Sequence, residues 1–167
     1  IVLLKVCMKS PLPVVLGAVV NKDHILLIKK NKSLFTDLWG MPSGKIQQGE
    51  NIDKAIVRKL AEKAGLDAKY EGLLGLVSEV LSESGNIVDH FLIFLCGLKA
   101  SDYSYTDSAE GKFRWFDLTD IENFRKIIIP SDFEMIKRIV LGGEHDNYFS
   151  LIEKINGNYE LKKFERF

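Results

Sequence analysis

Runs of apolar residues separated by a polar turn predict a strand pair near the start of the chain. Residues 13–20, PVVLGAVV, are apolar and rich in β-branched side chains, and residues 24–30, HILLIKK, follow a polar turn at 21–23. Two such runs joined by a short turn are typical of a β-hairpin. Residues 31–50 are rich in Gly, Pro and polar side chains. They predict a long loop, which in a compact domain usually carries function.

An amphipathic helix is predicted from Asn51 to about Ala64. Asn51 is a favourable N-cap, and Gly65 can end the helix in the left-handed conformation. The apolar side chains that should face the core are Ile56, Val57, Leu60 and Ala64. At about 100° per residue, a different third of the helix surface carries Lys59, Glu62 and Lys63.

Three strands are predicted in the middle of the chain. Apolar runs at about 70–80 and 87–98 flank a turn at residues 83–86, ESGN. A polar loop over residues 100–112 follows. The run FRWFDL, residues 113–118, predicts a short strand.

The last part of the chain predicts a helix and then a hairpin. Pro130 begins a helix that runs to about Leu141. In the tail, Asn156-Gly157 favours a two-residue hairpin turn, while a helix over residues 147–155 is the competing prediction. Strands mixed with two helices indicate the α+β class, and 167 residues suffice for one domain with its own core.

Composition gives no support for a nucleic-acid-binding, membrane or secreted protein. The chain has 23 Lys and Arg and 23 Asp and Glu, so zero net charge gives no general argument for a nucleic-acid or membrane partner. No apolar run reaches the roughly 18 residues that span a membrane. The opening IVLLKVCMK is too short for a signal peptide, so we expect a cytoplasmic protein. Cys7 and Cys96 lack metal-type spacing, and we expect two buried thiols in a reducing compartment.

The predicted loop and helix together resemble a known motif. GKIQQGENIDKAIVRKLAEKAGL, from Gly44 to Leu66, resembles the Nudix box. The pattern of that box is G, five residues, E, seven residues and R-E-U-x-E-E-x-G-U, where U is bulky and aliphatic. Seven of its nine fixed positions match at the correct spacing: Gly44, Glu50, Arg58, Leu60, Glu62, Gly65 and Leu66.

Flanking segments extend the resemblance over about residues 12–142. LWGMPSGK is similar to the family's LWxLPGGK approach to the box, and FRWFDLTDI is similar to its late strand and turn. The resemblance implies the Nudix fold, an α/β/α sandwich around a mixed β-sheet. We expect residues 1–143 to form the Nudix domain and residues 144–167 to form a C-terminal extension packed on the same domain.

The departures from the family pattern lie where its chemistry should be. The resemblance implies glutamates at positions 59, 62 and 63 that hold Mg²⁺ or Mn²⁺ against a diphosphate. Here the residues are Lys59, Glu62 and Lys63, so the charge of the three positions is +1 instead of −3. A unit cation about 4 Å from a divalent one is repelled by roughly 8 kcal/mol at an effective dielectric of about 20. We therefore do not expect Glu62 alone to hold the metal in the family's manner.

The retained residues have structural roles in the family. The resemblance implies that Glu50 and Arg58 brace the loop against the helix, and that Gly44 and Gly65 meet demands of the backbone. The sequence thus keeps the scaffold of the box and loses most of its metal ligands. This pattern indicates a Nudix fold that is specialised for binding or has changed chemistry.

The two lysines of the helix have two interpretations. Lys59 and Lys63 could be solvated side chains, as on an ordinary surface helix. In a Nudix loop–helix–loop, however, the same face lines the cleft. Their ammonium groups could then replace the metal and contact phosphate directly, because lysine is a competent phosphate ligand.

Residues of the preceding loop are further candidates for ligand binding. A basic and aromatic cluster that could hold a nucleotide's phosphate and base comprises Lys29, Lys30, Lys32, Phe35 and Trp39. Lys45, inside the box, is another candidate to bind phosphate. Core packing is the alternative interpretation of Trp39.

Two carboxylates are candidates for catalysis. Glu62 could bind metal or act as a general base, or it could be a remnant paired with Lys59 or Lys63. Glu110 lies in the loop before FRWF, where members of the family often carry a catalytic or metal-linked carboxylate. The alternative for Glu110 is an exposed loop residue.

Three functions follow from these features. The first is binding of a nucleoside-diphosphate derivative, such as a nucleotide, ADP-ribose or sugar nucleotide, with weak or no hydrolysis. The second is a Mg²⁺-dependent pyrophosphohydrolase that uses Glu62 and carboxylates outside the box, such as Glu110. The third is a non-catalytic interaction or RNA-binding module, of which zero net charge disfavours the RNA-binding role. The family resemblance also suggests a homodimer.

Overall fold

One mixed sheet organises the part of the chain that the computed structural model describes, residues 10–31 and 34–167. Within these residues the strand order is β3-β2-β1-β6-β5-β8-β9, with β4 paired to β1 and β7 to β2. The strands are β1 (Leu12–Asn21), β2 (His24–Lys30), β3 (Trp39–Gly40), β4 (Ser43–Lys45), β5 (Ala68–Glu83), β6 (Asn86–Ala100), β7 (Gly111–Asp117), β8 (Asn147–Ile155) and β9 (Asn158–Arg166).

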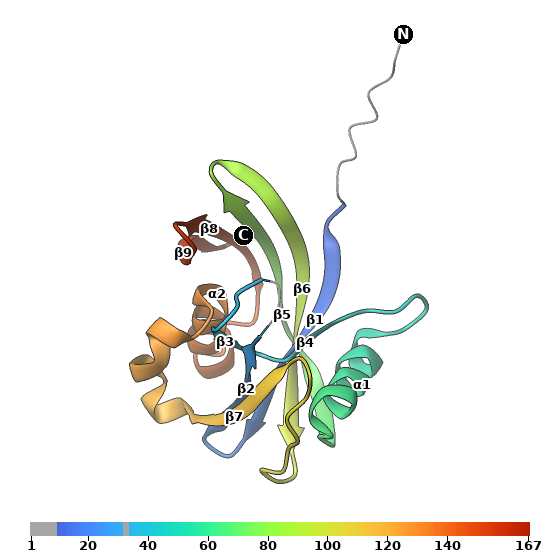
Figure 1. Ribbon diagram of the computed structural model, residues 1–167. Helices are drawn as coiled ribbons and strands as arrows, with labels where there is room; N and C mark the ends of the chain where they lie inside the picture. The colour runs from blue at the N-terminus through green and yellow to red at the C-terminus, as the bar shows by residue number, and fades with distance from the viewer. Residues whose placement is uncertain (1–9, 32–33) are drawn as a thin grey trace.

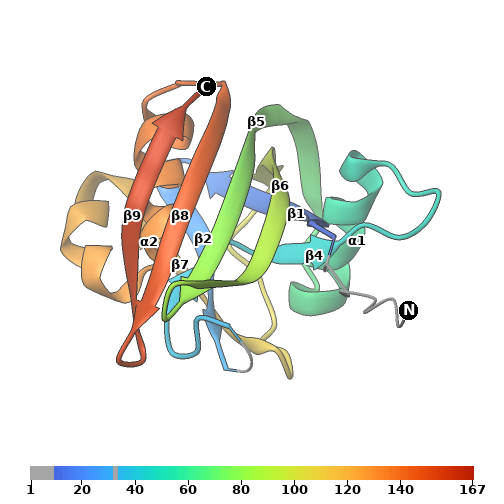
Figure 2. The same cartoon turned by 90° about the horizontal axis from the view of Figure 1, so that it is seen from above.

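Helices cover both faces of this sheet (Figures 1 and 2). Helix α1 (Ile52–Ala64) lies on one face. Helix α2 (Pro130–Glu134), which continues into a π-helical segment (Met135–Leu141), lies on the other with a 3₁₀ segment (Leu118–Ile127). Strands β1 and β6 pair in parallel and β5 and β6 antiparallel, so the sheet is mixed. The predicted α+β class and α/β/α sandwich are confirmed.

The alternation of side chains along β1 supplies both halves of the core. Val15 and Val19 pack on the α1 side, where Ile56 and Leu60 are buried. Leu16 and Ala18 face the opposite side and join a cluster that includes Phe133. Because strand side chains point alternately to the two faces, an uninterrupted apolar run is what a strand covered on both sides requires.

Helix α1 forms as its caps predict. The Asn51 side chain accepts the Ile52 N–H at 2.9 Å. Gly65 has φ +59°, and its N–H donates to the Ala61 carbonyl at 3.0 Å. The buried positions of the helix are Ala55, Ile56, Leu60 and Ala64, while Val57 is half-buried.

Several other elements differ from the prediction. Residues 31–50 are not one continuous loop, because they contain β3 and β4, each too short to show a periodic pattern. The predicted strands at 70–80 and 87–98 are longer in the structure and form the β5–β6 hairpin. The 3₁₀ segment after β7 was not predicted.

The tail forms the predicted hairpin and not the competing helix. Strand β8 pairs in parallel with β5, and β9 pairs antiparallel with β8 around the turn at Asn156-Gly157. Tyr148 and Ile152 of β8 are fully buried. The hairpin therefore continues the main sheet and contributes to its core.

The described cysteine is a buried thiol. Cys96 is free and fully buried, and burial raises its pKa to about 12, so the thiol stays protonated at neutral pH. Cys7 lies outside the described residues. Among the residues that are described, the helices are all too short or too polar to cross a membrane.

We predict that Leu60→Ala lowers the free energy of unfolding by about 2–5 kcal/mol, because a fully buried side chain leaves a cavity between α1 and the sheet. Urea unfolding monitored by circular dichroism measures this change. Val57→Ala is the matched control, because it truncates a half-buried side chain on the same helix and should cost less. Equal losses for the two variants would contradict this packing.

Candidate functional site

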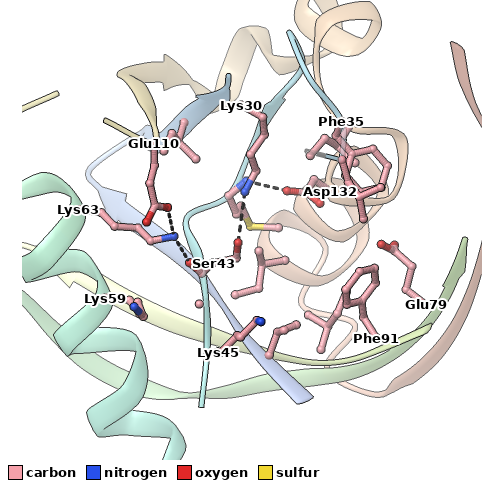
Figure 3. A pocket seen from close by; sticks show the side chains of 18 of the residues that line it. Lys30, Phe35, Ser43, Lys45, Lys59, Lys63, Glu79, Phe91, Glu110 and Asp132 are labelled. Carbon is pink, nitrogen blue, oxygen red and sulfur yellow. Dashed lines mark hydrogen bonds and ion pairs between the residues drawn. The ribbon is translucent and has the colours of Figure 1, made fainter. Parts of the chain in front are cut away.

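A cavity of about 550 Å³ opens beside α1 and β4. Its charged lining consists of the side chains of Lys30, Lys45, Lys59, Lys63, Glu79, Glu110 and Asp132. Its apolar lining consists of Leu12, Val14, Leu16, Ile28, Leu34, Phe35, Met41, Phe91, Ile93 and Ile129. Figure 3 shows Lys59, Lys63 and Glu110 at one end and Phe35, Phe91 and Glu79 at the other, with Lys30 between them.

The Glu50–Arg58 pair holds the box loop against α1. Arg58 binds both oxygens of the Glu50 carboxylate, through Nε at 2.6 Å and Nη2 at 2.7 Å. The same carboxylate accepts the Gln47 N–H at 3.0 Å. Hydrogen bonds from Arg58 lower the pKa of Glu50 to about 2. The pair therefore stays ionised at neutral pH and fixes the angle at which α1 meets the loop.

Lys59 and Lys63 reach the cavity from this helix. The Lys63 ammonium donates to the Ser43 carbonyl at 2.6 Å and pairs with Glu110 at 2.5 Å. The Lys59 side chain passes directly over Gly44, where an added Cβ would lie only 2.2 Å from Lys59 Cγ. Glycine at this position thus allows the lysine to lie along the loop and enter the cavity.

The two candidate catalytic carboxylates lie in different places. Glu110 lines the cavity, paired with Lys63. Glu62 does not line it and is half-exposed, with its oxygens 2.9 Å from Lys59 Nζ and 3.2 Å from Arg58 Nη1. The hydrogen bond from Lys59, followed by the smaller contribution of Arg58, lowers the pKa of Glu62. In the structure Glu62 is thus paired with two cations of its own helix.

The donor set on the box face does not fit a divalent cation. Mg²⁺ and Mn²⁺ prefer several oxygen ligands, whereas this face presents two ammonium groups. The carboxylate of Glu62 is already engaged by cations. Over residues 10–31 and 34–167, no three His, Cys, Asp or Glu side chains are grouped so that they could hold a metal ion.

Lys30 and Asp132 occupy the middle of the cavity. Lys30 Nζ donates to Ser43 Oγ at 3.2 Å, and burial lowers the pKa of this lysine. Asp132 is only 6% exposed, and its Oδ2 accepts the Met41 N–H at 2.6 Å. Burial raises the pKa of Asp132 to about 6. A lysine and a carboxylate that both depart from their ordinary pKa values mark this region as a candidate for ligand binding.

The two aromatic candidates for ligand binding, Phe35 and Trp39, lie in different surroundings. Phe35 lines the cavity, while Trp39 does not; its ring packs edge-on against Phe116 at 5.1 Å between centroids. Core packing is therefore the better interpretation of Trp39. Lys29 lies 3.6 Å from Asp37 and is not part of the lining either. Lys32 lies outside the described residues.

Glu79 lines the cavity, from a strand position that could reach the cleft but that nothing in the sequence singled out. It is 3% exposed and accepts a hydrogen bond from Ser150 Oγ at 3.3 Å. Burial raises its pKa to about 7. A usable signal was its position between Val77 and Leu81 on the buried face of a strand, because a carboxylate in register with core residues must itself be buried. Asp132 gave no such signal, since an acidic residue in the first turn of a helix is common.

We predict that Glu79→Gln removes part of the pH dependence of stability. The pKa of Glu79 is about 7 in the folded state against an ordinary value of 4.5. Between these values the unfolded chain releases a proton that the folded chain keeps, so the free energy of unfolding falls as the pH rises. Urea unfolding at pH 5 and pH 8 should show a larger loss in the wild type than in the variant. Asp132 titrates in both proteins, so the variant should keep some loss of stability. An equal loss between pH 5 and pH 8 in the wild type and the variant would contradict the prediction.

Comparison with known proteins matches most of this chain to one family. The model of the NUDIX domain matches residues 11–139. An ADP-ribose pyrophosphatase of Methanocaldococcus jannaschii is 33% identical over 113 residues, which cover 65% of this chain and 63% of that protein. An uncharacterized Nudix hydrolase of Bacillus subtilis, YvcI, is 28% identical over 104 residues, which cover 60% and 63%. The chain thus spans about 63% of the length of each of these relatives.

A solved structure shows the same fold. A MutT protein from Bacillus halodurans superimposes with a TM-score of 0.71 at 24% identity, covering 92% of this chain and 96% of that one. The resemblance drawn from the box is confirmed, because the family model spans more than half of the sequence. The chain belongs to the NUDIX domain family.

Proposed function

We propose that this protein binds a nucleoside-diphosphate derivative, namely a nucleotide, ADP-ribose or a sugar nucleotide, with weak or no hydrolysis. The observation that carries the proposal is that Lys59 and Lys63 reach the cavity from the box helix, at positions where the family pattern has glutamates. A site that elsewhere holds a cation against phosphates here presents cations of its own. The ADP-ribose pyrophosphatase among the relatives supports a ligand of this class.

The lysines can contact a diphosphate directly. Each ammonium group has three donors, and the contacts of Lys63 to Ser43 and Glu110 use two of them. Lys30 and Lys45 line the same cavity and bring further positive charge. Burial strengthens such contacts, because the effective dielectric inside a cavity is lower than in water. The lysine end of the cavity therefore suits the diphosphate.

The other end of the cavity suits the rest of the ligand. Phe35 and Phe91 offer aromatic surfaces, and a base stacked on an aromatic ring gains about 1–3 kcal/mol. The apolar lining between them excludes water from a ring that enters. A nucleoside-diphosphate derivative has this polarity, charged in one part and planar in another.

Weak hydrolysis follows from the same substitutions. Hydrolysis of a diphosphate needs an activated water and a group that stabilises the developing negative charge. The lysines can supply the second requirement. The first would fall to carboxylates, and Glu110 is held by Lys63 while Glu62 lies away from the lining. Efficient pyrophosphohydrolase activity is the second candidate function, which the name of the 33% identical relative favours.

We predict that Lys63→Ala and Lys59→Ala each weaken the binding of ADP-ribose by about ten- to a hundredfold, because each removes a hydrogen bond between charged groups. Calorimetric titration in buffer with EDTA measures the change in Kd. Lys54→Ala is the matched control, since it removes the same charge from a mostly exposed side chain of the same helix. That variant should bind like the wild type.

Two results would contradict the proposal. One is equal binding by the control and the two cavity variants, which would make the lysines bystanders. The other is fast, Mg²⁺-dependent turnover that Glu62→Gln abolishes, which would favour the hydrolase.

A further inference from the structure

The C-terminal hairpin binds two residues that line the cavity without lining it itself. Its strands β8 and β9 lie beyond residues 11–139, the part that the family model matches. Tyr159 and Ser150 of this hairpin do not line the cavity, but each binds a residue that does. The residue bound by Tyr159 is aromatic, Phe35, and the residue bound by Ser150 carries a carboxyl group, Glu79.

Tyr159 holds the first of these residues, Phe35. The Phe35 N–H donates to the Tyr159 hydroxyl at 3.2 Å, across 124 residues of sequence. The two rings also pack together, with centroids 4.6 Å apart. The backbone and the side chain of Phe35 are thus both fixed by one residue of β9.

Phe35 needs such a support. Its φ of +59° lies in the left-handed region, which is unfavourable for a bulky side chain. Asp37, two residues later, also has positive φ, at +69°. A turn with this backbone persists only where surrounding contacts stabilise it. Phe35 packs in a small core cluster with Leu81, Ile129 and Ile152, to which β8 contributes the last residue.

Ser150 holds the second residue, Glu79. Its hydroxyl donates to Glu79 Oε2 at 3.3 Å, and both residues are buried, at 0% and 3% exposure. A buried carboxyl group needs hydrogen-bond partners. Ser150 occupies one of its oxygens and thereby orients the group at the aromatic end of the cavity (Figure 3).

We propose that the β8–β9 hairpin is a positioning element of the ligand site. Through Tyr159 and Ser150 it fixes Phe35 and Glu79, and so determines which non-phosphate group the cavity accepts. That group is a planar ring carrying an N–H or O–H donor, which stacks on Phe35 and donates to Glu79. This inference rests on the proposed function, because it concerns the part of the same ligand that lies beyond the diphosphate.

Two ligands separate the hairpin from the lysines. Inorganic pyrophosphate needs only the lysine end of the cavity, whereas ADP-ribose needs both ends. Tyr159→Phe removes the hydroxyl that holds the Phe35 backbone and keeps the ring. We expect it to weaken ADP-ribose about three- to tenfold and to leave pyrophosphate unchanged, since it removes one neutral hydrogen bond from the support of Phe35. Calorimetric titration of both ligands measures this split.

Tyr148 of the hairpin and Ser82 of the neighbouring strand β5 offer controls. Tyr148→Phe removes a hydroxyl from β8 that donates to the Glu144 carbonyl at 2.9 Å, away from the cavity. For the second contact, Ser150→Ala should also weaken ADP-ribose alone, while Ser82→Ala removes a bond to the Ile152 carbonyl and should change neither ligand. Amide hydrogen exchange of Phe35 provides a direct readout, because Tyr159→Phe should accelerate it and Tyr148→Phe should not.

The outcomes distinguish the two levels of the proposal. A selective loss of ADP-ribose affinity in Tyr159→Phe and Ser150→Ala supports the positioning role. Unchanged affinity, or an equal loss for both ligands, overturns it while leaving diphosphate binding intact. Binding of neither ligand by the folded wild type overturns the proposed function and the positioning role together.

Discussion

The position of α1 on the sheet is the constraint on which the site depends. Burial of Leu60 and its apolar neighbours fixes one face of the helix, and about 100° per residue then fixes all the others. The bidentate pair of Arg58 with Glu50 sets the remaining freedom, because it ties the helix to the loop that precedes it. Gly44 completes the arrangement by leaving room for Lys59. Together these three features direct the side chains of Lys59 and Lys63 into the cavity.

The charges of the cavity are reorganised relative to the family pattern. Carboxylates have given way to ammonium groups on the box helix, while acidic groups line the cavity from other elements. Asp132 comes from α2 and Glu79 from β5, and both are nearly fully buried. Burial raises the pKa of Asp132 to about 6 and that of Glu79 to about 7, so both groups titrate close to neutral pH. The cavity is thus a cationic end joined to an aromatic end that can accept or donate hydrogen bonds.

Local signals in the sequence were enough for the elements and the family, but contacts between distant segments were not predictable. Asn51 and Gly65 predict the ends of α1, and the spacing from Gly44 to Leu66 identifies the box. Caps and motif spacing can be recognised because each depends only on residues that are neighbours along the chain. The short strands β3 and β4 have no period to detect. The contact of Phe35 with Tyr159 joins residues 124 apart, and no pattern in either segment specifies it. Trp39 was ambiguous, since an aromatic residue in a loop suits a ligand site and a core equally.

We propose that the ammonium groups of Lys59 and Lys63 take the place of a metal in this site. The most direct measurement is a calorimetric titration of the wild-type protein with ADP-ribose, performed once in EDTA and once in Mg²⁺. We expect binding with the same Kd in both buffers, because the lysines are part of the protein and need no added cation. Binding that appears only with Mg²⁺ would contradict it and would mean that carboxylates of this chain assemble a metal site when the ligand is present.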